Sequence, residues 1–413
     1  MSSATCRIVV TSAIAVTLGA GLTAQSGALD YTQWRGPNRD GAAAGFVEPK
    51  AWPKDLRQRW TANVGEGYAT PLVVGPRLYT ITRRGGNEVM MAVDAATGKV
   101  AWESSYPAPY KMNPATDGHG QGPKATPLFH DGKLFSLGIS GIVTAFDAAS
   151  GKRLWQTAAP SVDPTFGTAT SPLADGSRVI VHVGGHDNGA LTAFNKDTGA
   201  VVWRWTGDGP AYASPILATL GGTRQVVTIS QRNVVGLAAE TGTLLWQRPF
   251  KTTYDNNSTT PIQHGDTVVV SAQERGITAL RPVQRNGKWD VGVAWETREA
   301  GLFMSNAVAV GDVLYGLSHL SAGQFFALDL KTGTVLWKTR GREAENTAIV
   351  KADNVLFLLN DDAELIVARP NRKAFEPLQR YTVAKSATWA QPTVSGNRIF
   401  VKDVSSLTLW TLD

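Results

Sequence analysis

Short apolar runs separated by turns follow one another along most of the chain. Residues 127–158 show the pattern, with the runs PLFHDGKLFSLG, GIVTAFD and KRLWQTA, rich in β-branched and aromatic residues. The turns HDGK, ADGS, HGDT, VGDV, ADNV and SGNR supply Gly or Asn where a hairpin needs a positive φ. Almost no segment has the pattern of a helix, so the sequence predicts an all-β protein.

Two markers repeat along the sequence and count the units. Five copies of a nine-residue motif, the first being DAATGKVAW, place a glycine four residues before a tryptophan. A small polar residue, usually followed by proline, opens each unit, at Pro71, Pro127, Pro172, Pro215, Pro261 and, more weakly, Ser305, Asn346 and Gln391. Eight units of four strands predict an eight-bladed β-propeller of four-stranded antiparallel blades.

The two chain ends predict how the ring closes. The chain stops at LWTLD, where the outermost strand of the last blade should begin, and residues 56–65 (LRQRWTANVG) contain the missing strand and its tryptophan. We therefore expect an N-terminal strand to complete the last blade, which leaves no free edge between first and last blades. The predicted organisation is a signal peptide over 1–28, a leader segment over 29–55 and the propeller over 56–413.

Two blades depart from the repeat. The fifth has an insertion, residues 281–295, in place of the tight turn, and the seventh replaces the motif with residues 368–381, which contain no tryptophan.

We interpret the repeated motif as structural. The glycine supplies a positive φ, and the tryptophan ring can pack between neighbouring blades while its N–H finds a carbonyl. The motif lies on the outer half of each blade, far from the axis, so we do not expect these residues to bind a ligand. The expected docking residues are Trp60, Trp102, Trp155, Trp203, Trp246, Trp295 and Trp337, with Gly98, Gly151, Gly199, Gly242 and Gly333.

Composition and charge exclude some functions. The net charge of +6 is spread without a basic run, so we expect no nucleic-acid partner. The six histidines form no metal-ligand pattern.

The N-terminus predicts export. Arg7 precedes an apolar stretch over residues 8–22, followed by small residues that allow cleavage after Ala24 or Ala28. The alternative is an uncleaved anchor. The only cysteine, Cys6, lies ahead of the apolar stretch and cannot be lipidated. We therefore expect a periplasmic or secreted monomer that is not a lipoprotein and has no transmembrane segment after signal removal.

The pattern A-x-D-x-x-T-G-x-x-x-W on eight four-stranded blades resembles the docking motif of the pyrroloquinoline quinone (PQQ)-type propeller repeat. The resemblance covers residues 34–413, and WRGPNRDG (34–41) resembles a leader of bacterial members of uncertain function. This repeat builds quinoprotein alcohol dehydrogenases and also propellers with no known cofactor, such as the BamB subunit of the outer-membrane barrel assembly machinery.

The quinoprotein resemblance implies PQQ and Ca²⁺ at the mouth of the axial channel, lined by the residues ahead of each opener. Asp255 would be the base, and Glu345 with Asn346 would hold the cation. Trp389 would be the stacking floor, and Tyr68, Tyr212, Phe166 and Asn257 would line the cofactor site, with Tyr254, Phe303 and Asn256 nearby. The plainer interpretation is that these side chains fill a solvated channel. The disulfide between adjacent cysteines that covers the cofactor in those enzymes cannot form here.

The sequence favours a non-catalytic binding or scaffold protein with other envelope proteins as partners and no firm cofactor. Its rigid ring presents many loops for protein recognition. The first alternative is a PQQ- and Ca-dependent alcohol or sugar dehydrogenase. The second is a non-catalytic binder of saccharides or other small ligands at the channel mouth.

Overall fold

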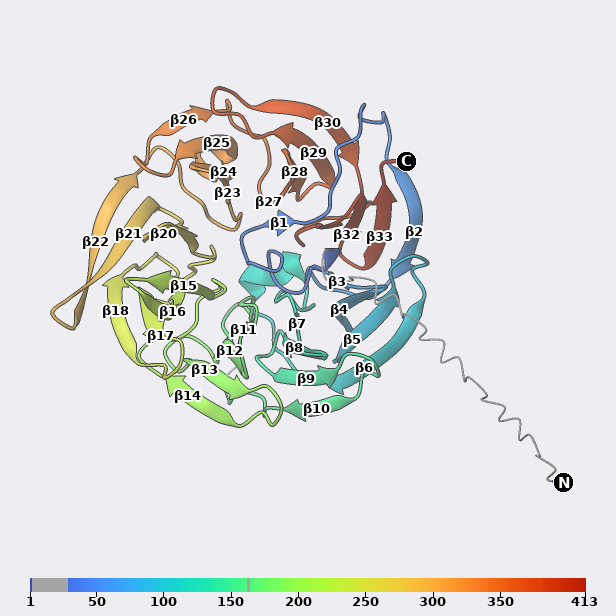
Figure 1. Cartoon of the computed structure of the whole chain (residues 1–413), viewed down its shortest axis with the longest axis horizontal. Coiled ribbons are helices and arrows are strands. Elements are labelled where there is room, and N and C mark those ends of the chain that lie inside the picture. Colours follow the sequence, from blue (N-terminus) through green and yellow to red (C-terminus); the bar gives the residue numbers. More distant parts are fainter. Residues whose placement is uncertain (2–28, 162–163) are drawn as a thin grey trace.

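The chain forms a closed ring of eight sheets around a central axis (Figure 1). A computed structural model describes Met1 and residues 29–161 and 164–413. The sheets are antiparallel blades of four strands, so the predicted eight-bladed β-propeller is confirmed. The expected signal peptide and Cys6 lie outside the described residues.

Blades 1 to 4 are built from consecutive strands, and the first strand of each lies nearest the axis (Figure 1). Blade 1 comprises β3 (Leu72–Val74), β4 (Arg77–Arg84), β5 (Asn87–Asp94) and β6 (Val100–Pro107). Blade 2 comprises β7 (Leu128–His130), β8 (Lys133–Leu137), β9 (Val143–Asp147) and β10 (Arg153–Gln156). Blade 3 comprises β11 (Leu173–Asp175), β12 (Arg178–Val183), β13 (Ala190–Asn195) and β14 (Val201–Trp205). Blade 4 comprises β15 (Ile216–Leu220), β16 (Thr223–Ile229), β17 (Asn233–Ala238) and β18 (Leu244–Pro249).

Blades 5 to 7 continue the order, and blade 8 joins the two ends of the chain. Blade 5 comprises β19 (Ile262–His264), β20 (Thr267–Ala272), β21 (Gly276–Arg285) and β22 (Lys288–Thr297). Blade 6 comprises β23 (Val308–Val310), β24 (Val313–Ser318), β25 (Gln324–Asp329) and β26 (Val335–Lys338). Blade 7 comprises β27 (Thr347–Ala352), β28 (Val355–Asn360), β29 (Glu364–Arg369) and β30 (Glu376–Thr382). Blade 8 comprises β31 (Thr393–Ser395), β32 (Arg398–Lys402), β33 (Ser406–Thr411) and β2 (Arg57–Asn63).

The ring closes where β2 pairs antiparallel with β33, as the chain ends predict. The sequence did not indicate a further strand: β1 (Ala42–Ala43) pairs parallel with β27 and adds a fifth strand to blade 7. Two 3₁₀ segments, η2 (Pro114–His119) and η3 (Leu320–Ala322), lie in connections. In the described part of the chain, no helix is long and apolar enough to cross a membrane.

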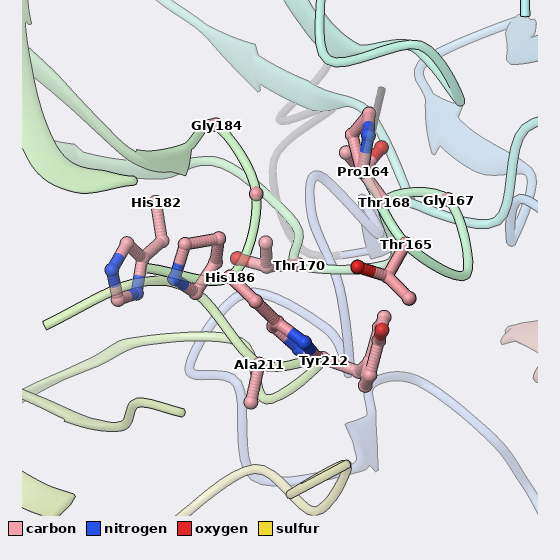
Figure 2. A pocket seen from close by; sticks show the side chains of 12 residues that line it. Pro164, Thr165, Gly167, Thr168, Thr170, His182, Gly184, His186, Ala211 and Tyr212 are labelled. Atoms are coloured by element: carbon pink, nitrogen blue, oxygen red, sulfur yellow. The ribbon is translucent and has the colours of Figure 1, made fainter. Parts of the chain in front are cut away.

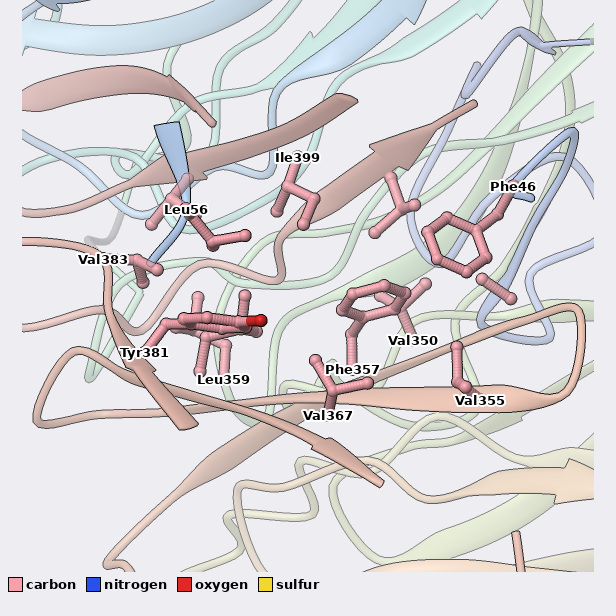
Figure 3. Packing of buried hydrophobic residues seen from close by; sticks show 14 residues of the cluster. Phe46, Leu56, Val350, Val355, Phe357, Leu359, Val367, Tyr381, Val383 and Ile399 are labelled. Atoms are coloured by element: carbon pink, nitrogen blue, oxygen red, sulfur yellow. The ribbon is translucent and has the colours of Figure 1, made fainter. Parts of the chain in front are cut away.

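The buried apolar side chains of the described residues form eight clusters, one between each pair of adjacent blades. Figure 3 shows the cluster between blades 7 and 8, where the leader contributes Phe46. Phe46 packs edge-on against Phe357 of β28, with ring centroids 5.1 Å apart. The hydrophobic stabilisation is therefore distributed around the ring at the seams between blades.

The repeated motif joins each of the five blades that contain it to the preceding blade. The Asp94 carboxylate accepts hydrogen bonds from the Thr97 N–H and hydroxyl, and Gly98 has a φ of 72°. The Trp60 ring of the preceding blade lies over this turn, and its indole N–H donates to the Ala95 carbonyl at 3.2 Å. A Cβ on Gly98 would lie 2.7 Å from that ring. The motif glycine therefore also leaves room for the tryptophan.

The same arrangement recurs at four more seams. Added Cβ atoms on Gly151, Gly199, Gly242 and Gly333 would lie 2.4–2.7 Å from the rings of Trp102, Trp155, Trp203 and Trp295. Trp337 donates to the Asn371 carbonyl of blade 7 at 2.8 Å, without a glycine beneath it.

Trp246 differs from the other motif tryptophans. Its indole N–H donates at 2.6 Å to Gln225 of its own blade, and its ring lies against Gly236. Blade 5 has the long β21–β22 hairpin where the motif turn would be, so no turn carbonyl is presented to Trp246. In blade 7, which lacks the tryptophan, Tyr381 of β30 donates to the Pro53 carbonyl at 2.8 Å.

The leader crosses the axial channel and contacts seven of the eight blades. Its backbone pairs with blade 1 at Tyr31–Val73, accepts from Phe129 of blade 2 and from Gly396 of blade 8, and forms β1 on blade 7. Its side chains reach three more blades: Arg39 donates to the Ser171 and Pro172 carbonyls, Trp34 to Thr260 and Arg35 to Ala307. The expected leader segment is thus an axial plug, and Figure 1 shows it running across the centre.

Candidate functional site

A cavity of about 420 Å³ opens at one end of the axial channel. Apart from the leader and the η2 segment, its lining residues precede the innermost strands of the blades. They are Tyr68, Lys124, Phe166, Ala169, Tyr212, Ser214, Tyr254, Asn256, Ser258, Thr260, Met304, Asn306 and Trp389, joined by Trp34, Ala115, Thr116 and His119. The channel mouth is therefore lined by the connections ahead of the strand openers.

Aromatic rings dominate this mouth cavity. The structure brings together Tyr68, Phe166, Tyr212 and Trp389, all named from the sequence, and Tyr254, which is exposed. Phe166 and Tyr212 lie with ring centroids 6.1 Å apart. Phe303 is not among the lining residues and packs near His319 instead. Flat apolar rings arranged around a cavity of this size favour a ring-containing ligand.

The charged groups of the mouth are basic. Lys124 is partly buried, and burial lowers its pKa to about 8. The His119 ring stands edge-on to Trp389 with centroids 4.5 Å apart, and burial lowers its pKa as well, followed by the effect of Lys124. None of the described residues that line the cavity is an aspartate or glutamate. The mouth therefore suits neutral or anionic ligands better than cations.

Asp255 and Asn257 do not line the mouth cavity. Asp255 accepts a hydrogen bond from Gln231 at 2.9 Å, with a φ of 53°, beside the ion pair of Asp187 and Arg232. The side chain of Asn257 is fully buried, and its amide donates to the carbonyls of Ser230, Gln231 and Phe250. Asn257 thus holds two backbone carbonyls of the β16–β17 turn of blade 4 and the carbonyl that follows β18.

Glu345 and Asn346 precede blade 7, whereas Asp255 precedes blade 5. Glu345 is exposed, and its charge only partly opposes burial and Lys124, which together lower the pKa of His119. Asn346 lines a smaller chamber. No group of three or more His, Asp or Glu side chains in residues 29–161 and 164–413 is placed to hold a metal ion. Calcium takes about six to eight oxygen ligands including carboxylates, so the mouth residues do not fit a PQQ–Ca²⁺ centre.

A second hollow lies between blades 2 to 4, near His182, His186 and Tyr212 (Figure 2). Its volume is about 10 Å³, roughly the space of one water molecule. His182 is buried, and burial lowers its pKa to about 4. This hollow is too small for an organic ligand.

The sequence did not place Trp34 at the mouth, and it gave no role to His119, Lys124 and Asn306, which stand in the segments ahead of two openers. Lys124 and Asn306 stand just ahead of two openers, so their position was a usable signal. Trp34 belongs to the leader, and nothing in the repeat places this segment at the mouth.

Comparison with known proteins finds relatives of two kinds. Outer membrane protein assembly factor BamB of Burkholderia pseudomallei (strain K96243) is 26% identical over 362 residues, which cover 76% of this chain and 88% of that relative. The dehydrogenase subunit of the quinone alcohol dehydrogenase of Komagataeibacter europaeus is 34% identical over 164 residues, which cover 38% of this chain and 21% of that subunit.

Solved structures of both kinds share the fold. BamB from Moraxella catarrhalis matches with a TM-score of 0.61 at 16% identity, covering 86% of this chain and 97% of its own. The quinohemoprotein alcohol dehydrogenase of Comamonas testosteroni matches with a TM-score of 0.65 at 14% identity, covering 94% of this chain and 81% of its own.

Residues 86–339 match the family described as outer membrane protein assembly factor BamB. This match spans more than half of the sequence and contains blades 2 to 6 with the four seams between them. The chain therefore belongs to the family of outer membrane protein assembly factor BamB, built on PQQ-type propeller repeats.

Proposed function

We propose that this chain is an exported, non-catalytic binding and scaffold protein of the cell envelope, working as a monomer with outer-membrane assembly proteins. The observation that supports it most is the extent of the likeness. The Burkholderia BamB relative aligns over 88% of its own length, whereas the dehydrogenase subunit aligns over 21% of its length. About four fifths of the dehydrogenase subunit therefore lies outside its sequence alignment with this chain.

The geometry of the mouth supports the same proposal. A dehydrogenase of this fold needs a base and a cation beside its cofactor. The lining residues of the described mouth cavity include no carboxylate, and Asp255 is held by Gln231 outside it. A rigid ring with an axial plug instead presents fixed loops at both faces, which suits protein recognition.

Deletion of the gene in its native bacterium tests the proposal. We expect the amount of folded outer-membrane β-barrel protein to fall, and the wild-type chain to restore it. A Lys124→Met/Trp389→Ala variant, which changes the mouth, should restore it equally if its thermal midpoint matches the wild type. Failure of this folded variant would place the function at the mouth instead.

Cross-linking in the intact envelope identifies the partner. The wild-type chain and the mouth variant should both recover the same outer-membrane assembly protein. Recovery of no such protein from either would contradict the scaffold function.

The dehydrogenase relatives favour a second candidate, a PQQ- and Ca²⁺-dependent alcohol or sugar dehydrogenase. The mouth has rings that suit a planar cofactor, among them Trp389 and Tyr68, but its lining in the described part of the chain has no carboxylate for the cation that this candidate requires. Titration with PQQ and Ca²⁺, followed by thermal stability and dye-linked oxidation, tests it. Saturable stabilisation with turnover, lost in a Trp389→Ala variant, would support the enzyme and contradict the scaffold proposal.

A further inference from the structure

A chamber of about 50 Å³ adjoins the mouth cavity. The two share Trp34, Met304, Asn306 and Trp389, so the chamber lies beside the aromatic mouth with these residues between them. Its remaining lining residues are Arg35, Asn346, Thr347, Ala348, Ile349, Thr388 and Gln391. A buried water needs about 10–15 Å³ of such space, so the chamber has room for a small ion and not for an organic ring.

Arg35 of the axial plug is 1% exposed and lines this chamber. Its Nη2 donates to the Ala307 carbonyl at 2.6 Å, and its Nε donates to the Arg39 carbonyl at 3.3 Å. Its Nη1 is buried and has no hydrogen-bond partner in the described part of the chain. Two of the three guanidinium nitrogens therefore fix the side chain, and the third carries unused donors.

No acidic side chain lines the chamber in the described residues. The nearest carboxylate that affects Arg35 is Asp40, which is 3.1 Å from the ammonium group of Lys351. Burial lowers the pKa of Arg35 to about 10, which is the effect of a desolvated cation without an adjacent counter-charge. A buried guanidinium is costly unless an anion or further acceptors approach it.

Two side-chain amides complete a set of donors. The Asn306 Oδ1 accepts from the Thr260 N–H at 2.7 Å, so the NH₂ group is the end of this amide that remains for a ligand. Asn346 is fixed through its backbone N–H, which donates to Asp361 at 2.9 Å, and it too lines the chamber. The hydroxyls of Thr347 and Thr388 both donate to Asn360, so these two donors are already used.

We propose that this chamber is an anion-binding site, in which the Arg35 guanidinium and the amides of Asn306 and Asn346 hold a small anion or the carboxylate group of a larger ligand. A free halide or formate ion fits the chamber alone. A ligand with a ring could place its carboxylate in the chamber and its ring in the aromatic mouth. The donor chemistry is the same in both cases, and the site is independent of the scaffold function.

Crystals of the full chain soaked in sodium bromide test the site directly. We expect an anomalous bromide peak beside Arg35 Nη1, and saturable binding of bromide and formate by calorimetry at constant ionic strength. A water molecule at this position in the presence of bromide, with no saturable binding, would overturn the proposal.

Ala348→Leu is the decisive variant, because it fills the chamber with apolar atoms and removes no polar contact. Its dissociation constant for bromide should rise about tenfold or more. Arg35→Lys should weaken binding to a similar extent, whereas Arg39→Lys changes an equally buried arginine that does not line the chamber and should leave binding within about twofold. Equal binding by wild type and Ala348→Leu would overturn the proposal even if Arg35→Lys failed to fold.

Benzoate distinguishes the two sources of the anion. If the site serves a ring-bearing carboxylate, benzoate should bind about tenfold more tightly than formate, and Trp389→Ala should remove the difference. If the site serves a free anion, benzoate and formate should bind equally in both proteins. Both results support an anion site and identify its ligand, while binding of neither carboxylate and no bromide peak would exclude it.

Discussion

A motif glycine in this propeller meets two requirements at one position. Gly151 has a φ of 73°, and a Cβ there would lie 2.4 Å from the Trp102 ring of the preceding blade. Gly132, in the same blade, has a φ of 71°, but a Cβ there would meet nothing within 4 Å. The two glycines have nearly the same backbone φ and differ only in how closely a neighbouring side chain packs. Comparing them therefore separates the cost of backbone strain from the cost of a steric clash.

Gly132→Ala should lower the free energy of unfolding by about 1 kcal/mol, and Gly151→Ala by about 3 kcal/mol, because Trp102 must also move. Denaturant unfolding of both variants measures the difference. Equal losses of unfolding free energy would show that the Trp102 ring accommodates a Cβ at position 151 without cost.

His182 of β12 gives a pH dependence at the residue scale. Its ring is buried near the Asp208 carbonyl, and its folded pKa is lowered to about 4. In the unfolded chain the imidazole takes up a proton near the ordinary histidine pKa of 6.5, whereas in the folded chain it remains neutral there. The unfolded state therefore binds more protons between these values, and stability should fall as the pH falls through this window.

The His182→Gln substitution removes the group that titrates in this pH range. Between pH 7 and pH 4 the wild type should lose up to about 3 kcal/mol more unfolding free energy than the variant. Unfolding curves at several pH values measure the gap. Parallel curves for the two proteins across this range would exclude His182 as the source.

At the scale of residues, the sequence identified most of the aromatic rings that line the mouth. Tyr68, Phe166, Tyr212 and Trp389 could be named because a propeller places the residues ahead of each inner strand around one end of the axis. Asn257 could not be separated from them, since position alone does not say whether an amide faces the cavity or the carbonyls behind it.

At the scale of elements, the β21–β22 hairpin is the main departure from the repeat. It extends beyond the ring in Figure 1, and β22 also lies against β18 of blade 4. Trp289 on this hairpin packs with the cluster between blades 4 and 5, and its ring lies beside Gly221 of blade 4. The insertion therefore covers the seam where Trp246 finds no motif turn.

Trp289→Ala should cost about 2 kcal/mol of unfolding free energy, because a half-buried indole is lost from this seam. Lys288→Ala, an exposed change in the same hairpin, should cost less than about 0.5 kcal/mol. Denaturant midpoints of the two variants check this. A Trp289→Ala protein as stable as wild type would mean that the hairpin does not support the seam.

The leader shows what local sequence patterns do not contain. Strand runs and turns are read from neighbouring residues, and they predicted all eight blades. The position of Arg39 depends on the carbonyls of Ser171 and Pro172, more than a hundred residues away. β1 is only two residues long and forms by pairing with the edge of β27. Such a short segment shows no alternating pattern from which a strand could be predicted.

For the whole molecule, the stabilising clusters lie between blades, so each blade depends on both neighbours. One junction in the ring is not covalently continuous: the closing seam inside blade 8, where β2 from the N-terminal side pairs with β33 from the C-terminal side. These two strands are held by their pairing, by the apolar clusters on either side of blade 8 and by the leader contacts. If the ring unfolds as one unit, opening this seam must accompany unfolding.

A disulfide across the seam tests this. Thr61 and Thr408 are paired residues of β2 and β33, with hydroxyl oxygens 3.0 Å apart and 347 positions between them. Paired residues of antiparallel strands have Cα atoms about 4.5–5.5 Å apart, which a disulfide spans. Thr61→Cys/Thr408→Cys should raise the unfolding free energy by up to about 6 kcal/mol, because it closes a very long loop.

The matched control is Thr144→Cys/Gln156→Cys, a paired position inside blade 2 with a separation of 12 residues. This bond should add about 3 kcal/mol. Oxidised and reduced forms of each protein, unfolded in denaturant, give the two gains. A gain at the seam larger than the gain within the blade means that the ring opens when the protein unfolds. Equal or smaller gain at the seam would mean that β2 and β33 separate only after the blades have lost their packing.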